Sequence, residues 1–358
     1  MNQMERQQTL DFIASNNLGE PGRYRYSRHC TQPTLYSSSY AAMILDLLNA
    51  WDGVDKAAWL AYLQSFQEDD GLFKDPVIWN YGWYEGDPFW CGRTHLTTHV
   101  LPAMLALGGV AEKEITFLNP WKDPDWLAGW MAEQDWGPGV DTTGNIVMNA
   151  AVLLQYARDF HHDAAAGRAV EQILDWLDTN HVDPETGLWG GLDLSDPKQL
   201  SNYVQGAYHW WVAYFYDKRP LPHWEKAMEN ILRTRNPLNG FGWGVHNPED
   251  PYQSSACEDI DSLDPLCRLW MSGVTRDPRV REAIEAGRER VASNRMADGG
   301  LCFYRDREFE YGHPQLYGGK NEGAMFPTWF RTLTLCLCDA ALGTDTTLNF
   351  RRCPGYQF

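Results

Sequence analysis

The sequence contains no apolar run close to the roughly 18 residues that a membrane-spanning helix requires. Its first residues, MNQMERQQTLDF, are polar and lack the apolar stretch of a signal peptide. Positive charge is also scarce, because 30 Lys and Arg face 48 Asp and Glu and leave a net charge of −18. This balance disfavours nucleic acid and anionic lipid as partners. We therefore expect a cytoplasmic protein with no membrane span, no nucleic-acid partner and a small-molecule substrate.

Patterned cysteines and nucleotide-binding loops are missing too. The eight cysteines are scattered through apolar sequence without CxxC pairs or regular spacing. This is typical of reduced core thiols, so we predict eight free thiols. The sequence also lacks a GxSxG nucleophile elbow, a Walker-type phosphate loop and a strand-borne GxGxxG. It therefore offers no case for a serine-hydrolase triad, an NTPase or a dinucleotide enzyme, and we expect no cofactor.

Helical periodicity is the strong signal that is present, and no segment shows sustained strand-like alternation. Six segments have one apolar and one charged face, as helices exposed to water on one side do: 3–15, 55–67, 122–133, 164–180, 221–234 and 278–295. They alternate with six segments that are apolar on nearly every side, as buried helices are: 36–49, 92–107, 143–159, 200–216, 255–271 and 323–342. The pattern predicts an all-α protein.

The buried segments recur at a regular distance along the chain. Their starts are 56, 51, 57, 55 and 68 residues apart, which indicates a repeat. Five of them follow a turn of glycine and aromatic residues, at 71–73, 136–139, 187–191, 240–244 and 299–303. Glycine permits a tight bend there, and the ring can pack on its neighbour. We predict one domain, 1–358, built as an (α/α)6 toroid of six inner and six outer helices, with a tail after Leu342 that wraps the outside.

Polar residues on the buried helices are the candidate site, because they either face the hollow of an inner barrel or are hydrogen-bonded within the core. Most lie in the first two turns of their helices, so they would gather at one end of the barrel. These positions are Tyr36, Tyr40, Arg93, His95, His99, Asn145, Asn149, Asn202, Gln205, Tyr208, His209, Glu258, Asp259, Asp261, Trp329 and Arg331. We expect substrate contacts from Tyr40, Arg93, His95, His99, Asn149, Tyr208, His209, Trp210, Trp329 and Arg331.

The acidic run 255–265 is the sharpest local signal. Ser255 and Glu258 have the spacing of a capping box, which predicts a structural role for Glu258. Asp259 also gains from the positive end of the helix dipole. Asp261 lies deeper, and Pro265 leaves its carbonyl without an i→i−4 partner. Burial and a neighbouring carboxylate would keep Asp261 protonated, as a general acid near neutral pH must be, although a structural helix-start acid stays open.

His95 and His99 are four residues apart on one helix face, a spacing that can bind zinc. The pair lacks the glutamate of HExxH, and no third ligand has an obvious spacing. We therefore predict histidines that form hydrogen bonds in the barrel, and no metal.

Gln67-Glu68-Asp69-Asp70-Gly71-Leu72-Phe73 resembles the Gln-x-x-x-Gly-x-aromatic repeat of the terpenoid cyclase and protein prenyltransferase superfamily. Residues 183–189 are similar but lack the glutamine, and the turns at 240–244 and 299–303 are degenerate versions. Asp259-Ile260-Asp261-Ser262 resembles the Asp-x-Asp-Asp or Asp-x-Asp-Thr motif of the proton-initiated (class II) cyclases. The resemblance implies that Asp261 is the acid and that Asp259 is its supporting partner.

Two features depart from that family. Class II cyclases usually have two toroids, and this chain has room for one. The prenyltransferase zinc motif, Asp-x-Cys, occurs here in the reverse order, as Cys257-x-Asp259.

Two functions follow, together with a noncatalytic binding toroid as a third alternative. In the leading hypothesis Asp261 protonates an isoprenoid-like substrate of a cyclase or isomerase, and aromatic rings shield the carbocation. In the alternative the chain is a carbohydrate-active (α/α)6 enzyme, a glycoside hydrolase, lyase or epimerase. Trp and Tyr then stack on sugars, and Asp261 works with a second carboxylate, Asp141 or Glu322. A closed apolar lumen would favour the cyclase, and an open cleft with two carboxylates would favour the carbohydrate-active enzyme. A filled barrel would favour the noncatalytic binding toroid.

Overall fold

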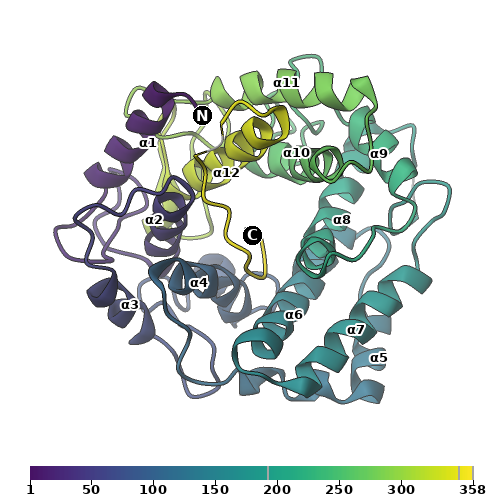
Figure 1. Ribbon diagram of the computed structural model, residues 1–358, viewed down its shortest axis with the longest axis horizontal. Coiled ribbons are helices and arrows are strands. Elements are labelled where there is room, and N and C mark those ends of the chain that lie inside the picture. Colours follow the sequence, from purple (N-terminus) through teal and green to yellow (C-terminus); the bar gives the residue numbers. More distant parts are fainter. Residues whose placement is uncertain (192, 346, 357–358) are drawn as a thin grey trace.

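The computed structural model describes residues 1–191, 193–345 and 347–356. Twelve α-helices in this part of the chain form two concentric rings (Figure 1). The outer helices are α1 (Gln3–Ser15), α3 (Lys56–Gln64), α5 (Pro124–Ala132), α7 (Ala164–Thr179), α9 (Trp224–Arg233) and α11 (Pro278–Ala292). The inner helices are α2 (Leu35–Leu47), α4 (Arg93–Leu107), α6 (Val140–Phe160), α8 (Pro197–Asp217), α10 (Ala256–Met271) and α12 (Met325–Leu342).

The inner helices close into a barrel. Each contacts the next inner helix along the chain, and α12 returns to contact α2. The remaining short elements lie in the connections: η1 (Gly82–Tyr84), η2 (Thr116–Leu118), η3 (Pro120–Lys122), η4 (Pro314–Leu316), and the antiparallel strands β1 (Phe309–Glu310) and β2 (Tyr317–Gly318). The prediction of an all-α (α/α)6 toroid is confirmed. In the described residues no helix has the length and apolar character that crossing a bilayer demands.

Burial explains why the two sets of helices alternate. Every residue of α2 is buried, since this helix packs between its neighbours in the ring and the outer layer. The outer helix α11 buries one face, through Val280, Ala283, Ile284, Gly287 and Val291, at the three- and four-residue spacing of an amphipathic helix. Helix starts are fixed locally, because Thr34, Asp163 and Asp277 each accept a first-turn backbone N–H. Each such cap stabilises its helix by about 1 kcal/mol.

A bridged turn precedes most inner helices. Antiparallel bridges join Asn17 to Tyr24, Gln67 to Phe73, Val182 to Trp189, Arg235 to Phe241 and Arg295 to Leu301. Four of these are the glycine and aromatic turns expected from the sequence. At Gly71 the left-handed φ of +87° and the carbonyl of Glu114, 2.2 Å from where a Cβ would lie, both exclude a larger residue. The first bridge, at 17–24, was not predicted.

Connections at the two ends of the barrel differ in length. The chain runs from outer to inner helices through long segments, such as 65–92 and 293–324, whereas 161–163 and 218–223 suffice for the return at the other end. The long segments therefore gather where the inner helices begin, and they supply the residues around the barrel mouth.

The C-terminal segment does not wrap the outside, so that prediction was wrong. Instead it turns into the centre of the ring (Figure 1). Arg351 forms an ion pair with Asp46 of α2 at 2.7 Å, and Cys353 and Tyr356 are buried. The physical reason is apolar burial, because the Tyr356 ring packs against Trp329 and Phe330 of α12.

Candidate active site

A cavity of about 310 Å³ lies at the end of the barrel where the inner helices begin. Inner helices supply His95, His99, Asp141, Thr142, Asn145, Gln205, His209, Cys257, Asp261, Phe326 and Phe330. The connections supply Trp83, Trp90, Cys91, His246, Phe303, Phe309 and Tyr311, and the C-terminal segment supplies Tyr356. Polar side chains from four inner helices thus converge at one end of the barrel.

Asp261 lines this cavity and is only 2% exposed. Its Oδ2 atom has no hydrogen-bond partner among the described residues. Desolvation by burial raises the pKa of the Asp261 carboxyl well above its ordinary value, and the charges of Glu258, Asp264 and Asp259 raise it further. This shift favours the protonated form of the acid. Pro265 lies inside α10 without ending it, and the helix continues to Met271.

Asp259 is turned away from the cavity. It forms an ion pair with Arg331 at 2.6 Å, with both side chains fully buried, and accepts the backbone N–H of Phe241. Arg331 also donates to the carbonyls of Cys302, Ser254 and Phe303. A buried guanidinium needs this many acceptors, so the pair ties the turns before α10 and α12 together. Arg331 does not line the cavity, so its expected substrate contact stays a prediction. The expected support of Asp261 by Asp259 also stays a prediction, and the charge of Asp259 does raise the pKa of Asp261.

Glu258 forms the predicted capping box. The Ser255 hydroxyl accepts the Glu258 N–H at 3.1 Å, and the Glu258 carboxylate accepts the Ser255 N–H at 2.8 Å. The carboxylate also accepts the N–H of Val245, which holds the preceding turn in place. Burial raises the pKa of Glu258 to about 7.

The predicted histidines His95, His99 and His209 all line the cavity. The Nδ1 atom of His95 lies 2.7 Å from the Tyr36 hydroxyl, and its Nε2 lies 3.4 Å from Nε2 of His99. His209 donates from Nδ1 to the carbonyl of Gln205 at 2.6 Å. Desolvation lowers the pKa of His95 to about 3 and that of His209 to about 4, and it lowers the pKa of His99 well below its usual value. The three imidazoles are neutral at pH 7.

No group of three or more potential metal ligands occurs in the described part of the chain. The cavity-lining residues there also include no lysine or arginine. The amide, imidazole and carboxyl groups of the wall can form hydrogen bonds with a ligand.

Other predicted contact residues lie behind the cavity wall. Tyr40 stacks on Trp329 with ring centroids 5.0 Å apart, and Tyr208 donates to Asp264 at 2.7 Å. Trp210 packs edge-on against Trp189. Tyr208 and Trp329 also contact Tyr356, so they pack around the C-terminal segment and do not line the cavity itself.

Arg93 and Asn149 are likewise occupied elsewhere. Arg93 forms ion pairs with Asp87, Glu68 and Asp70. Asn149 donates to the carbonyl of Phe89 at 2.8 Å. Both hold the connection that precedes α4, and neither lines the cavity. Their role as substrate contacts stays a prediction.

The structure distinguishes between the two candidates for the second carboxylate. Asp141, in the first turn of α6, lines the cavity. Glu322 does not, because it forms an ion pair with Arg28 and a hydrogen bond with His29. The sequence places both residues close to the start of an inner helix, so it could not choose between them.

Sequence reasoning predicted aromatic rings around the substrate but did not name the residues that form this wall. Trp83 and Trp90 come from the connection before α4, and Phe309 and Tyr311 come from the β1–β2 hairpin before α12. The signal available was the density of aromatic residues in 79–90 and 303–311. His246 was also missed. It lies in the connection before α10, and its Nδ1 atom is 2.9 Å from the hydroxyl of Ser255, which caps that helix.

No protein-family model and no curated protein sequence matches this chain. Among solved structures, a polysaccharide lyase is 11% identical with a TM-score of 0.53, covering 96% of this chain and 98% of the lyase. A type II terpene cyclase from Scytonema, in complex with geranylgeranyl dihydroxybenzoate, is 14% identical with a TM-score of 0.51, over 95% of this chain and 97% of the cyclase. A family 88 glycosyl hydrolase from Bacteroides vulgatus is 12% identical with a TM-score of 0.51, over 94% and 99%.

Carbohydrate-active enzymes and a terpene cyclase thus share this architecture at very low identity. The likeness concerns the fold, and the function must be argued from the site. The chain has the fold of the α/α toroids.

Proposed function

We propose that this chain is an enzyme that acts on a saccharide by acid–base chemistry, with Asp261 as the proton donor. One observation supports the proposal above the others. A carboxyl group whose pKa is raised by burial faces a cavity with an unpaired oxygen, and the surrounding wall offers hydrogen-bonding groups as well as aromatic rings. A positioned acid of this kind accelerates a reaction by roughly 10²–10⁴-fold.

The polar part of the wall favours a sugar over a hydrocarbon. Gln205 lines the cavity with a buried Nε2 that has no hydrogen-bond partner among the described residues. Asn145, His99 and His209 add amide and imidazole groups to the same wall. A hydrocarbon would leave such groups without partners, at a cost of about 1–3 kcal/mol each. Sugar hydroxyls satisfy them, and ring faces such as that of Trp90 can stack on the apolar face of a sugar.

Asp141 is the proposed second carboxyl group. It enters from α6, while Asp261 enters from α10 two places further round the inner ring. In glycoside cleavage one carboxylic acid protonates the leaving oxygen, and a carboxylate on the other side activates water or attacks the anomeric carbon. We assign the first role to Asp261 and the second to Asp141.

A class II-type cyclase is the second candidate, favoured by the rings beside Asp261. Phe303, Phe309, Phe326 and Phe330 line the cavity and can stabilise a carbocation through their π faces. The four cavity imidazoles weigh against it, because neutral imidazole is a base that would remove a proton from a carbocation early.

The test is a substrate screen with purified wild-type and Asp261→Asn protein. One arm follows new reducing ends or unsaturated sugars from a panel of defined oligosaccharides. The other follows cyclised products from linear isoprenoid alcohols and diphosphates by mass spectrometry. We expect turnover in the saccharide arm that is lost in the variant. Turnover confined to the isoprenoid arm would replace the proposal with the cyclase, and an equally active Asp261→Asn protein would remove the acid from both.

A further inference from the structure

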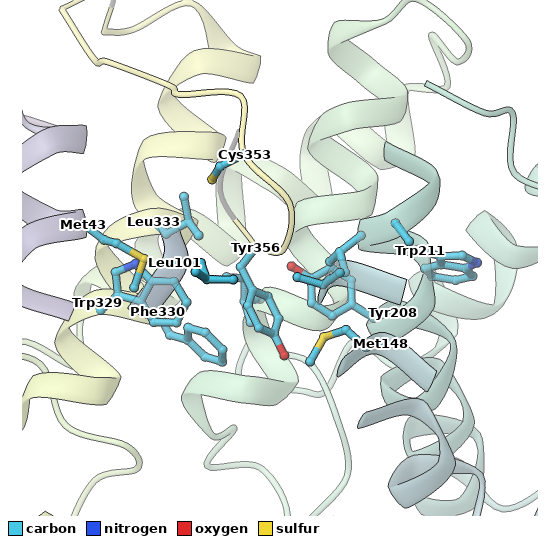
Figure 2. Close-up of a cluster of buried hydrophobic side chains, with 14 of the residues drawn as sticks. Met43, Leu101, Met148, Tyr208, Trp211, Trp329, Phe330, Leu333, Cys353 and Tyr356 are labelled. Atoms are coloured by element: carbon cyan, nitrogen blue, oxygen red, sulfur yellow. The ribbon is translucent and has the colours of Figure 1, made fainter. Parts of the chain in front are cut away.

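The deep end of the cavity is closed by the C-terminal segment. Tyr356 reaches across the barrel, between Phe330 on one side and Tyr208 on the other (Figure 2). Its ring centroid lies 5.1 Å from that of Phe330, 6.0 Å from that of Tyr208 and 5.8 Å from that of His99. These three rings belong to α12, α8 and α4, so Tyr356 forms a floor that separates the cavity from the far end of the barrel.

A second flank is closed by two connections that meet. The Trp83 and Tyr311 rings lie edge to face with centroids 5.5 Å apart, and the Tyr84 hydroxyl donates to the Tyr311 carbonyl at 2.8 Å. A Cβ on Gly82 would lie 2.0 Å from the carbonyl oxygen of Gly312, so the two backbones touch. The connection before α4 and the β1–β2 hairpin therefore form a continuous cover.

The third flank leads into a groove. Asp141 lines both the cavity and a neighbouring, open depression of about 610 Å³. The groove runs past Pro138, Lys198 and Asn202 at the starts of α6 and α8. Lys198 is the single lysine or arginine among the described residues that line either hollow. The proposed second carboxylate thus lies at the junction between a cavity closed on two flanks and a polar groove.

From this shape we infer that the site binds the end of an oligosaccharide chain. The terminal unit occupies the cavity, and the bond that reacts lies between Asp261, which protonates its oxygen, and Asp141. The following units lie in the groove against Lys198 and Asn202. A chain bound through an internal unit would need to leave the cavity in two directions. The floor at Tyr356 and the cover at Trp83 and Tyr311 block the second exit. This inference rests on the proposed saccharide function and adds the size of the substrate and the direction of binding.

The experiment measures binding to Asp261→Asn protein, which should hold a saccharide without turning it over. The probes are gluco-, manno- and galacto-oligosaccharides from the monosaccharide to the hexasaccharide. Each is supplied in three forms. One is unmodified, one carries a bulky aromatic group on the reducing end, and one carries the same group on the non-reducing end. We expect affinity to rise about tenfold from the monosaccharide to the trisaccharide, since the added units form hydrogen bonds in the groove. We also expect one of the two blocked series to lose binding.

Variants locate the effect in the groove. The double substitution Lys198→Ala and Asn202→Ala should remove the gain with chain length and leave monosaccharide affinity unchanged. Lys226→Ala, on the exposed face of the outer helix α9, is the matched control and should bind as the parent does. Equal binding of both blocked series, or a monosaccharide bound as tightly as the trisaccharide, would overturn the chain-end inference while the saccharide function stands. Failure of every saccharide to bind would instead overturn the proposed function, and this inference with it.

Discussion

The two ends of the inner barrel are built from the same six helices, yet they differ in what fills them. At the end where the helices begin, the lumen holds a cavity with Asp261, Asp141 and four imidazoles. Towards the other end the lumen is packed with apolar side chains around Tyr356, including Met148, Leu101 and Leu333 (Figure 2). The first end receives the longest connections, 65–92 and 293–324, and the second receives the short turns 161–163 and 218–223 and the C-terminal segment.

This difference explains why only one end of the ring of inner helices has a site. Short turns such as 161–163 cannot reach over the lumen, so at that end the hollow is filled by apolar burial. Long connections such as 65–92 and 293–324 reach across the mouth and leave a lined space beneath them. Helix α10 shows a similar difference on a smaller scale. Asp259 forms a buried ion pair, whereas Asp261 faces the cavity.

The largest effect is expected from Asp261→Asn. The change preserves shape and removes the transferable proton, so turnover of the substrate identified by the screen should fall by roughly 10²–10⁴-fold while the melting temperature stays within a few degrees. Steady-state kinetics and thermal denaturation on the same preparation provide the check. A fully active variant would show that Asp261 is a structural acid and that the chemistry lies elsewhere.

Asp259→Asn should have the opposite profile. It keeps a hydrogen bond to Phe241 but leaves the buried charge of Arg331 without its partner, which typically costs about 3–5 kcal/mol of stability. Chemical denaturation of Asp259→Asn and Asp261→Asn under the same conditions compares the stability effects of two residues on one helix. If Asp259→Asn unfolds at the same denaturant concentration as Asp261→Asn, the distinction between a structural and a cavity-facing aspartate is wrong.

Tyr356→Ala tests the packed end of the barrel. Truncating an aromatic ring that is 5% exposed should cost about 3 kcal/mol, in the lower part of the range for buried aromatic side chains. Tyr252→Ala is the control, because that ring is 38% exposed and its loss should change the free energy of unfolding by about 0.5 kcal/mol or less. Equal, small losses for both would mean that the C-terminal segment does not occupy the lumen in solution.

Glu258→Ala should cost about 0.5–2 kcal/mol, the usual range for losing a helix cap, and should retain measurable activity. Its carboxylate serves backbone N–H groups of Ser255 and Val245 rather than the cavity. Urea denaturation together with the activity assay separates the two roles. Loss of activity without loss of stability would assign Glu258 to the chemistry.

The finest comparison is the pH dependence of stability. The folded state holds the proton of Asp261 more tightly than the unfolded chain does, because the folded pKa is raised. Its contribution to stability is full below the unfolded pKa of about 3.9 and is lost as pH rises through the folded pKa. The melting temperature of Asp261→Asn relative to wild type should therefore increase as pH rises from that value. A difference that stays constant with pH would contradict the raised pKa.

Much of the fold follows from the sequence, because its causes are local. A helix at 278–292 needs only its apolar spacing and the cap of Asp277, and the capping box of Ser255 and Glu258 needs only residues three positions apart. The repeat of buried segments also predicts a closed ring, since apolar faces must be covered. Likewise, Cys30, Cys91, Cys257, Cys267, Cys302, Cys336 and Cys338 are free thiols in the structure.

The site is a different matter, because it depends on residues far apart in the chain. Sequence alone placed Asp261, His95, His99 and His209 on buried helices. It had no means of knowing that Arg331 and Asp259 satisfy each other, or that Asp141 reaches the cavity while Glu322 pairs with Arg28. Which face of an all-apolar helix meets the lumen is set by its two neighbours in the ring, and no periodicity within one helix encodes it.

The sequence by itself determined the helices, their alternation, their caps and the presence of an acid on the fifth inner helix, since each rests on spacing within a short segment. Only the tertiary structure decided that the acid faces a cavity, that the hairpin at Tyr311 covers it and that Tyr356 closes its floor. Those outcomes depend on how well distant apolar rings pack once the ring has closed, and packing is a property of the assembled barrel.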